Sequence, residues 1–333
     1  MRKIAIALLT VLPAAAQTWE LQRSGTQASL RGLGALNRNV VWASGTGGTY
    51  VFTGDGGTTW KTGTVPSAEG LDFRDLHIVD ARTVYLLSIG PGAASRVYKT
   101  IDGGSTWRLM FTNPDEKGFF DAIAFWDANR GIVIGDQVDG RPTAFTTSNG
   151  GQTWERRTTP AALPNEGSFA ASGTCLVVRG REEAWFATGG TGAARVFRTT
   201  DSGKSWTVAP TPLRNDAASA GIFSLAFRDG GRGIAVGGDY TKDRETSGNI
   251  AVTADGGRTW TEPSGRPAGF RSAVVRVSGI WVATGTSGSD ISYDGGVTWK
   301  TFDTGAFHAL SFISEKLGWA SGPQGRVAIF RPR

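Results

Sequence analysis

The residues best suited to chemistry are ionisable side chains that recur at one place in a series of short apolar segments. When seven such segments are aligned on their alternating apolar residues, that place holds Arg31, Arg74, Asp121, Ala170, Phe223, Arg271 and His308. Five ionisable groups around one ring would be costly if they were buried dry and unpaired. The pattern therefore predicts that the ring is hydrated, that its charges pair with one another, or that it binds an anion. Arginine side chains can bind a carboxylate through two parallel hydrogen bonds.

Further polar residues fall in loops that we expect on the same face as this ring. Asp136 and Arg141 follow one strand, Glu166 precedes the fourth inner segment, and Asp239 and Tyr240 follow a later strand. One interpretation is a solvated rim of mutually paired charges. The functional interpretation is a ligand-binding site for an anion or a peptide, and the sequence leaves both open.

An internal repeat shows which elements must position these residues. A pattern of the form Ser/Thr-x-Asp-x-Gly-x-Thr/Ser-Trp occurs six times, at 53–60, 100–107, 147–154, 199–206, 253–260 and 292–299. Its tryptophans lie 47, 47, 52, 54 and 39 residues apart. A period of about 40–50 residues is typical of one four-stranded propeller blade.

Turn chemistry accounts for every residue of this eight-residue box. We expect its Asp, or Asn149 in the third copy, to accept hydrogen bonds from the backbone two residues on, while the glycines supply positive φ. The Trp then begins the next strand. Six such turns cannot all be active sites, so the box aspartates are predicted to be structural: Asp55, Asp102, Asp201, Asp255 and Asp294.

The two ends of the chain give the number of blades. After the sixth box the chain supplies three further strands, at 307–312, 317–321 and 326–331, without a fourth. Residues 17–21 match the start of an outer strand, so we expect them to complete the last blade. The predicted fold is an all-β, seven-bladed β-propeller of four-stranded antiparallel blades, formed as one domain by residues 17–333.

The first sixteen residues are predicted to be a signal peptide. A basic start, Met1-Arg2-Lys3, is followed by an apolar run at 4–12 and by small residues up to Ala16. The apolar run is too short to span a bilayer as a helix, so we expect no membrane span. The mature protein is predicted to be exported, to the periplasm or the extracellular space, and to be a monomer.

Composition argues against several classes of protein. With hydrophobic residues at 39% and charged residues at 19%, the chain is neither disordered nor, with Cys175 alone, a disulfide scaffold. Two histidines and one cysteine make a zinc site improbable, and we expect no metal and no cofactor. The formal charge of +6 is spread along the chain without a basic run, which argues against nucleic acid.

The boxes resemble the Asp-box (BNR) repeats of sialidases, xyloglucanases, sortilin-type receptors and photosystem II stability/assembly factors. The fuller unit, with residues 41–45 or 317–322 before a glycine-rich turn, most resembles the assembly factors. That resemblance implies a non-enzymatic, exported propeller that binds a membrane or envelope protein, or an anionic ligand, through an arginine-bearing face. Strand alignment places Arg31, Arg74 and Arg271 on that face.

The alternative is a sialidase-like glycoside hydrolase, in which the arginines would hold a substrate carboxylate. Asp121 would supply the acid and Tyr240 the nucleophile. However, no Arg-Ile-Pro segment precedes the first inner strand, and no Tyr lies at an inner strand start. The sequence therefore favours the binding module and assigns no catalytic residue.

Overall fold

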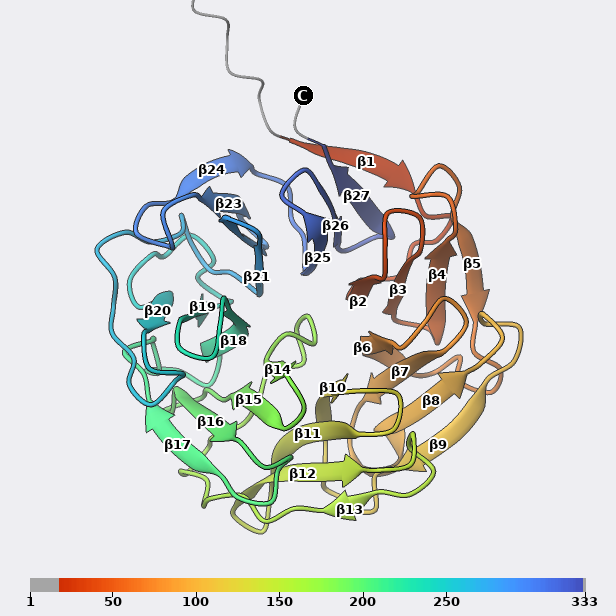
Figure 1. Ribbon diagram of the computed structural model, residues 1–333, viewed down its shortest axis with the longest axis horizontal. Coiled ribbons are helices and arrows are strands. Elements are labelled where there is room, and N and C mark those ends of the chain that lie inside the picture. The colour runs from red at the N-terminus through yellow and green to blue at the C-terminus, as the bar shows by residue number, and fades with distance from the viewer. Residues whose placement is uncertain (1–17, 332–333) are drawn as a thin grey trace, which may run out of the picture.

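The computed structural model describes residues 18–331, which form a closed ring of seven antiparallel sheets around a central channel (Figure 1). The predicted seven-bladed all-β propeller is therefore confirmed. The predicted signal peptide, 1–16, lies outside the described residues. The part of the chain that is described contains one short 3-10 helix, η1 (Gly92–Ala94), and no helix long and apolar enough to cross a membrane.

Each blade runs from an inner strand at the channel to an outer strand at the rim. Blade 1 contains β2 (Leu30–Ala35), β3 (Val41–Gly45), β4 (Thr49–Thr53) and β5 (Lys61–Thr64). Blade 2 contains β6 (Asp72–Ile78), β7 (Val84–Ile89), β8 (Arg96–Thr100) and β9 (Arg108–Thr112). Blade 3 contains β10 (Phe120–Phe125), β11 (Gly131–Val138), β12 (Arg141–Thr147) and β13 (Glu155–Arg156).

Blades 4 to 7 continue the ring, and blade 5 has a reduced outer edge. Blade 4 contains β14 (Leu176–Arg179), β15 (Glu183–Ala187), β16 (Arg195–Thr199) and β17 (Thr207–Pro210), and blade 5 contains β18 (Ala220–Phe227), β19 (Gly233–Asp239) and β20 (Ile250–Thr253). Blade 6 contains β21 (Ala273–Val277), β22 (Ile280–Gly285), β23 (Gly288–Ser292) and β24 (Lys300–Asp303). Blade 7 contains β25 (Ala309–Ser314), β26 (Leu317–Ser321), β27 (Arg326–Phe330) and β1 (Trp19–Arg23). In blade 5 a single bridge, Val252 to Thr261, stands in the place of the fourth strand.

The N-terminal strand closes the ring, as the sequence predicts. β1 pairs antiparallel with β27 from Trp19 opposite Phe330 to Arg23 opposite Arg326. The Trp19 ring is buried against Phe307 and Phe330, and its indole N–H donates to Ser289 Oγ of blade 6 at 3.0 Å. The strand thus joins the two chain ends, and one aromatic anchors it to the neighbouring blade.

The boxes are structural turns, but their hydrogen bonds differ from the expected ones. In the first box the Asp55 carboxylate accepts from the backbone N–H of Thr59, four residues on, at 2.9 Å, and from the Thr59 hydroxyl at 2.6 Å. Thr53 Oγ1 donates to the same carboxylate at 2.8 Å. These donors lower the pKa of Asp55 to about 2. The expected bond from two residues on was wrong because Gly56 and Gly57, both at positive φ, extend the turn.

A second repeated turn escaped the sequence analysis. Between the first and second strands of four blades, an Asn or Asp side chain accepts from backbone N–H groups two and three residues on; these residues are Asn37, Asp80, Asp127 and Asp229. Each turn also accepts a bond from the box of its own blade, as Gly56 N–H donates to Asn39 O at 2.9 Å. The two turns brace each other at one end of the blade.

The boxes also connect neighbouring blades. Tyr50 Oη of blade 1 donates to Gly104 O in the box of blade 2 at 2.8 Å, and Tyr85 Oη of blade 2 does the same to Gly150 O of blade 3. Apolar clusters fill the spaces between successive blades, so most of the core lies between sheets. Hydrogen bonds to the boxes and apolar packing between the sheets therefore both join neighbouring blades.

Candidate functional site

Four of the seven aligned positions are β-bulges. The pairing of the inner strand shifts by one residue between Leu30 and Gly32, Phe73 and Asp75, Phe120 and Ala122, and Ile222 and Ser224. The extra residues are Arg31, Arg74, Asp121 and Phe223. A bulge redirects its extra side chain and commonly occurs beside functional sites. These four side chains line one cavity at the mouth of the channel.

The fourth inner segment departs from the alignment. β14 begins at Leu176, and Ala170 lies in a preceding loop, residues 168–174, which we call the crossing loop. In Figure 1 this green segment, leading into β14, reaches toward the middle of the ring. The alignment of Ala170 with an inner strand was therefore wrong, although Ala170 still reaches the cavity.

The crossing loop is bonded to several blades. Ser172 Oγ donates to Ser272 O of blade 6 at 2.8 Å, and Thr174 Oγ1 lies 2.6 Å from Ser224 Oγ of blade 5. Gly173 sits so close to blade 2 that an added Cβ would fall 1.9 Å from Asp75 Oδ1, so only glycine fits there. These bonds and contacts hold the loop across the channel, where it forms one side of the cavity.

The cavity has a volume of about 440 Å³ and a divided lining. Its basic sector is Arg31, Arg74 and His308; its acidic sector is Asp121 and Asp136 with Ser168; its aromatic sector is Phe169, Phe223, Tyr240 and Phe270; the remaining lining residues are Phe119, Ala170, Ala171, Ser272 and Thr286. Six of the seven aligned positions thus meet here. The basic sector comes from blades 7, 1 and 2, and the aromatic sector from the crossing loop and blades 5 and 6.

Arg31 is the cation without a counter-ion. Within residues 18–331 no carboxylate lies within ion-pair distance of its guanidinium, which donates only a long bond of 3.4 Å to Ala171 O. Burial, followed by the nearby Arg74 charge, lowers the pKa of Arg31 to about 10, and the Asp72 carboxylate, which pairs with Arg74, opposes this shift only in part. The side chain is therefore still charged at neutral pH, although it is partly desolvated and unpaired.

Arg74 and His308 complete the basic sector. The Nε of Arg74 bonds to Asp72 Oδ2 at 2.7 Å, and its Nη1 makes a long bond of 3.4 Å to Ala170 O. Burial and the charges of Arg31 and Arg74 lower the pKa of His308 to about 3. The imidazole is therefore neutral at physiological pH, and the positive charge of this sector comes from the two arginines.

The acidic sector contains two carboxyl groups whose pKa values are raised. Asp121 is fully buried, and its Oδ2 has no hydrogen-bond partner among the described residues. Burial, followed by the neighbouring Asp136 carboxylate, raises the pKa of Asp121 well above its usual range. Burial likewise raises the pKa of Asp136, whose Oδ1 accepts from Ser168 N–H at 2.9 Å. The sector therefore binds protons more readily than free carboxylates do.

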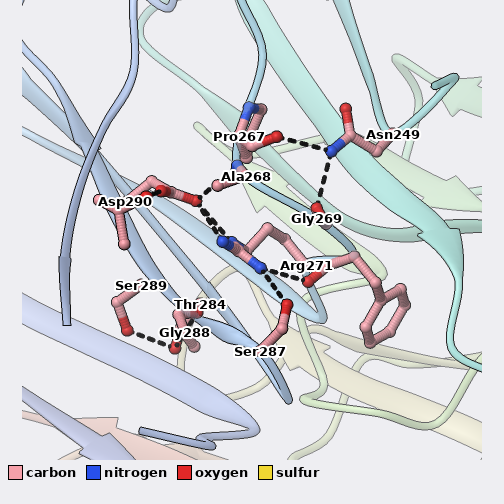
Figure 2. A network of polar contacts seen from close by, with 12 residues as sticks. Asn249, Pro267, Ala268, Gly269, Arg271, Thr284, Ser287, Gly288, Ser289 and Asp290 are labelled. Carbon is pink, nitrogen blue, oxygen red and sulfur yellow. Dashed lines mark hydrogen bonds and ion pairs between the residues drawn. The ribbon is translucent and has the colours of Figure 1, made fainter. Parts of the chain in front are cut away.

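Arg271, the third predicted arginine, does not line the cavity. Its guanidinium is fully buried, with Nε 2.7 Å from Asp290 Oδ2 and Nη1 donating to Phe270 O at 2.7 Å and Ser287 Oγ at 3.0 Å (Figure 2). The alignment is one residue off in blade 6. Arg271 N–H donates to Gly237 O as Leu30 N–H donates to Gly322 O, so Ser272, which lines the cavity, stands where blade 1 has Arg31. The expectation that three arginines converge was therefore wrong.

Other predicted site residues are used within the scaffold. Glu166 is buried and accepts from Arg195 Nε at 2.8 Å and from Thr188 Oγ1 at 2.6 Å. Asp239 accepts from the backbone N–H and hydroxyl of Thr241. Neither is part of the cavity lining, whereas Tyr240 stands at the cavity with half of its side chain exposed.

Sequence reasoning missed the aromatic residues contributed by blades 4 and 6. Phe169 and Phe270 directly precede Ala170 and Arg271, the two aligned positions that proved irregular. A signal was present, since both are aromatic residues outside the alternating pattern of a strand. Only their packing on Phe223 shows that both rings reach the cavity.

Comparison with known proteins shows which proteins this chain resembles. No protein-family model matches the chain. The photosystem II assembly protein Ycf48 of Thermosynechococcus vestitus is 24% identical over 292 residues, covering 73% of this chain and 74% of that protein. A solved structure of Ycf48 bound to a D1 peptide superposes with a TM-score of 0.65 at 18% identity, over 95% and 97% of the two chains. This chain resembles the photosystem II assembly factors.

Two further similarities involve enzymes. A xyloglucanase from Paenibacillus is 27% identical over 206 residues, which cover 56% of this chain but only 19% of that protein. A streptogramin B lyase superposes with a TM-score of 0.67 at 13% identity, over 96% and 98% of the two chains. Likeness at this level shows a shared fold, so the function must be argued from the cavity itself.

Proposed function

We propose that this propeller is a non-catalytic binding module that holds a carboxylate-bearing segment of a partner protein in the cavity at the channel mouth. The observation that carries the proposal is Arg31, a partly desolvated guanidinium without a counter-ion. Removing a charge from water is costly unless the charge is paired. A ligand carboxylate would supply the missing partner, and a guanidinium can bind it through two parallel hydrogen bonds.

The surroundings of Arg31 favour an anion over a cation. Arg74 is paired with Asp72, so Arg31 remains the positive charge of this sector without an ion pair, and the neutral His308 adds a polar group without opposing charge. The raised pKa of Asp121 favours its neutral carboxylic acid, which can donate a hydrogen bond to an incoming anion. Each of these groups would be better satisfied with an anion present.

Similarity to Ycf48, which has been solved with a D1 peptide, supports a protein partner. We further propose that the protein acts after export, on the basis of the basic and apolar pattern at 1–16, and that it meets a membrane or envelope protein there as a monomer. Periplasmic or extracellular location would be seen by fractionating cells that express the full chain. Recovery of uncleaved protein from the cytosol would contradict this part of the proposal.

Peptide selection tests the proposal without a known partner. Random peptides displayed with a free C-terminus are selected on the immobilised protein, and the enriched sequences are synthesised with a free carboxylate or as amides. We expect enrichment of carboxylate-bearing peptides whose affinity, by isothermal titration calorimetry, falls at least tenfold in Arg31→Gln. Arg108→Gln, at an exposed arginine on β9, is the matched control and should bind normally. Equal binding by the two variants would overturn the proposal.

Hydrolysis of an acidic sugar is the competing activity, since Asp121 has the raised pKa of a general acid. Its other predicted member is less suitable, because the Tyr240 ring packs against Phe223. Glu166 is engaged by Arg195 and lies outside the cavity lining. A fluorogenic sialoside and an aryl glycoside test this activity directly. Turnover that disappears in Asp121→Asn would replace the binding module with a hydrolase.

A further inference from the structure

The aromatic sector of the cavity consists of rings that pack against one another. Phe169 stacks on Phe223 with ring centroids 3.9 Å apart and planes 11° from parallel. Phe270 meets the same Phe223 ring edge-on at 4.7 Å and 90°, and Tyr240 meets it at 6.2 Å and 77°. Three rings are thus arranged around one, and the Tyr240 side chain is 51% exposed.

This surface is separate from the cores between the blades. Phe223, Phe270 and Ala171, with Phe169 packed against them, form their own small cluster, and all four residues also line the cavity. Phe223 is the bulge residue of blade 5, at the position where blades 1, 2 and 3 present Arg31, Arg74 and Asp121. The bulge therefore brings an aromatic ring to the ligand cavity, where its equivalents bring charges.

The crossing loop fixes the distance between the aromatic and basic sectors. Phe169 belongs to the stacked cluster, Ala170 O accepts from Arg74, and Ala171 O accepts from Arg31. These three residues are consecutive, so the Cα atoms of Phe169 and Ala171 are at most about 7 Å apart. The loop thus joins the aromatic sector to the two arginines over a short stretch of backbone, which suits a ligand of one residue or two adjacent residues.

We infer that the bound segment carries a large apolar side chain, aromatic or aliphatic, on the carboxylate-bearing residue or directly beside it, and that this side chain packs against Phe169, Phe223 and Tyr240. The inference rests on the proposed function and specifies which carboxylate segments are accepted. A cavity of about 440 Å³ has the size of a small-molecule pocket, which suits a few residues of a peptide. Partly exposed tyrosine beside a buried cluster is also typical of binding hot spots.

Four synthetic peptides test the inference by titration calorimetry up to millimolar concentration. The first is Gly-Ser-Gly-Ser-Gly-Phe with a free carboxylate, the second is its amide, and the third has Ala in place of Phe. The fourth is acetyl-Gly-Ser-Phe-Glu-Gly-Ser-amide, in which the carboxylate belongs to a side chain next to Phe. We expect at least one of the two Phe-carboxylate peptides to bind at least tenfold more tightly than both the amide and the Ala peptide, and their ratio identifies the carboxylate source.

Two variants divide the recognition into its parts. Tyr240→Ala should reduce the preference for Phe over Ala at least threefold while preserving the preference for carboxylate over amide. Arg31→Gln should remove the carboxylate preference and preserve part of the Phe preference. Tyr293→Ala is the matched control, since Tyr293 is 58% exposed in the sixth box, outside the cavity lining. Unchanged thermal midpoints establish that each variant is folded.

The possible failures are distinguishable. Carboxylate-dependent binding that is equal for the Phe and Ala peptides overturns this inference and leaves the proposed function standing. Absence of carboxylate-dependent binding by any of the peptides, with the wild-type protein folded, counts against both. Binding of the Phe peptides that Tyr240→Ala and Tyr293→Ala weaken equally would also overturn the assignment of the apolar site.

Discussion

Arg31 of blade 1 and Arg271 of blade 6 have opposite environments. Sequence alignment puts them at one place in their blades, but the structure puts Arg271 one residue earlier. Its backbone N–H donates to Gly237 O of the preceding blade, as Leu30 N–H donates to Gly322 O, so Ser272 stands where blade 1 has Arg31. Arg31 is a bulge residue at the cavity without an ionic partner, whereas Arg271 is fully buried against Asp290. Figure 2 shows that the segment before Arg271 is also held by Asn249, whose amide donates to the carbonyls of Pro267 and Gly269. The comparison teaches that one residue of register, together with a counter-ion, decides whether an arginine belongs to the scaffold or faces the cavity.

The largest effect is expected when the buried ion pair between Arg271 and Asp290 is broken. Arg271→Ala should lower the free energy of unfolding by about 3–5 kcal/mol, because it leaves the Asp290 carboxylate buried and unpaired. Denaturant unfolding monitored by tryptophan fluorescence measures the change. The double variant Arg271→Met with Asp290→Leu is the control and should be much closer to wild type. A loss below about 1 kcal/mol for Arg271→Ala would show that the pair does not stabilise blade 6.

Asp75 extends the comparison to a buried carboxylate without a cation. It accepts from Leu76 N–H and from Ile123 N–H of blade 3, each at 2.7 Å, yet burial raises its pKa to about 7. Because the folded pKa exceeds the unfolded value of 3.8, the contribution of Asp75 to the free energy of unfolding should be greatest below about pH 4 and fall as pH rises to about 7. The fall from this group should be a few kcal/mol.

Two variants isolate the contribution of Asp75. Asp75→Asn cannot titrate, so the difference in unfolding free energy between wild type and variant should change across about pH 4–7 and be constant above it. Asp75→Ser is a second variant, chosen because Ser224 of blade 5 accepts the equivalent bond from Val274 N–H at 2.9 Å. A difference that is flat with pH would mean that Asp75 does not titrate in this range.

Arg31→Gln sharpens the comparison at the cavity. Since Arg31 lacks an ionic partner and is partly desolvated, its loss should change the unfolding free energy by less than about 1 kcal/mol. Carboxylate binding should nevertheless fall at least tenfold in the same variant. Thermal unfolding and titration of one preparation give both quantities. A large loss of stability would assign Arg31 to the scaffold with Arg271.

The smallest effect is expected at an exposed box. Asp55→Asn should lower the thermal midpoint only slightly, because Asn149 occupies the same position in the third box and accepts the equivalent bond from Thr153 N–H. Asp55→Ala should lower it further, since the donors from Thr53 and Thr59 would lose their acceptor. Differential scanning calorimetry ranks the two variants. Equal midpoints for them would show that the box carboxylate contributes little to the fold.

Much of the site could be predicted, because the repeat places the inner strands in register. The alignment correctly brought Arg31, Arg74 and Asp121 to one cavity, together with Phe223 and His308. It failed for Arg271, which stands one residue earlier in its blade than Arg31 does and pairs with Asp290 on another strand. It also missed Phe169, because a loop that crosses a channel has no periodicity to reveal it.

The amino-acid sequence by itself determined the number of blades, the box turns and the closure by residues 19–23. These features depend on local turn chemistry and on a period that the chain displays directly. Only the tertiary structure decided which of the aligned arginines keeps a charge without an ion pair and which loop residues join the cavity. A one-residue bulge turns Arg31 into the cavity, Asp290 engages Arg271 within blade 6, and bonds to two other blades hold the crossing loop in place. Such choices depend on contacts between residues far apart in the chain, so local sequence does not encode them.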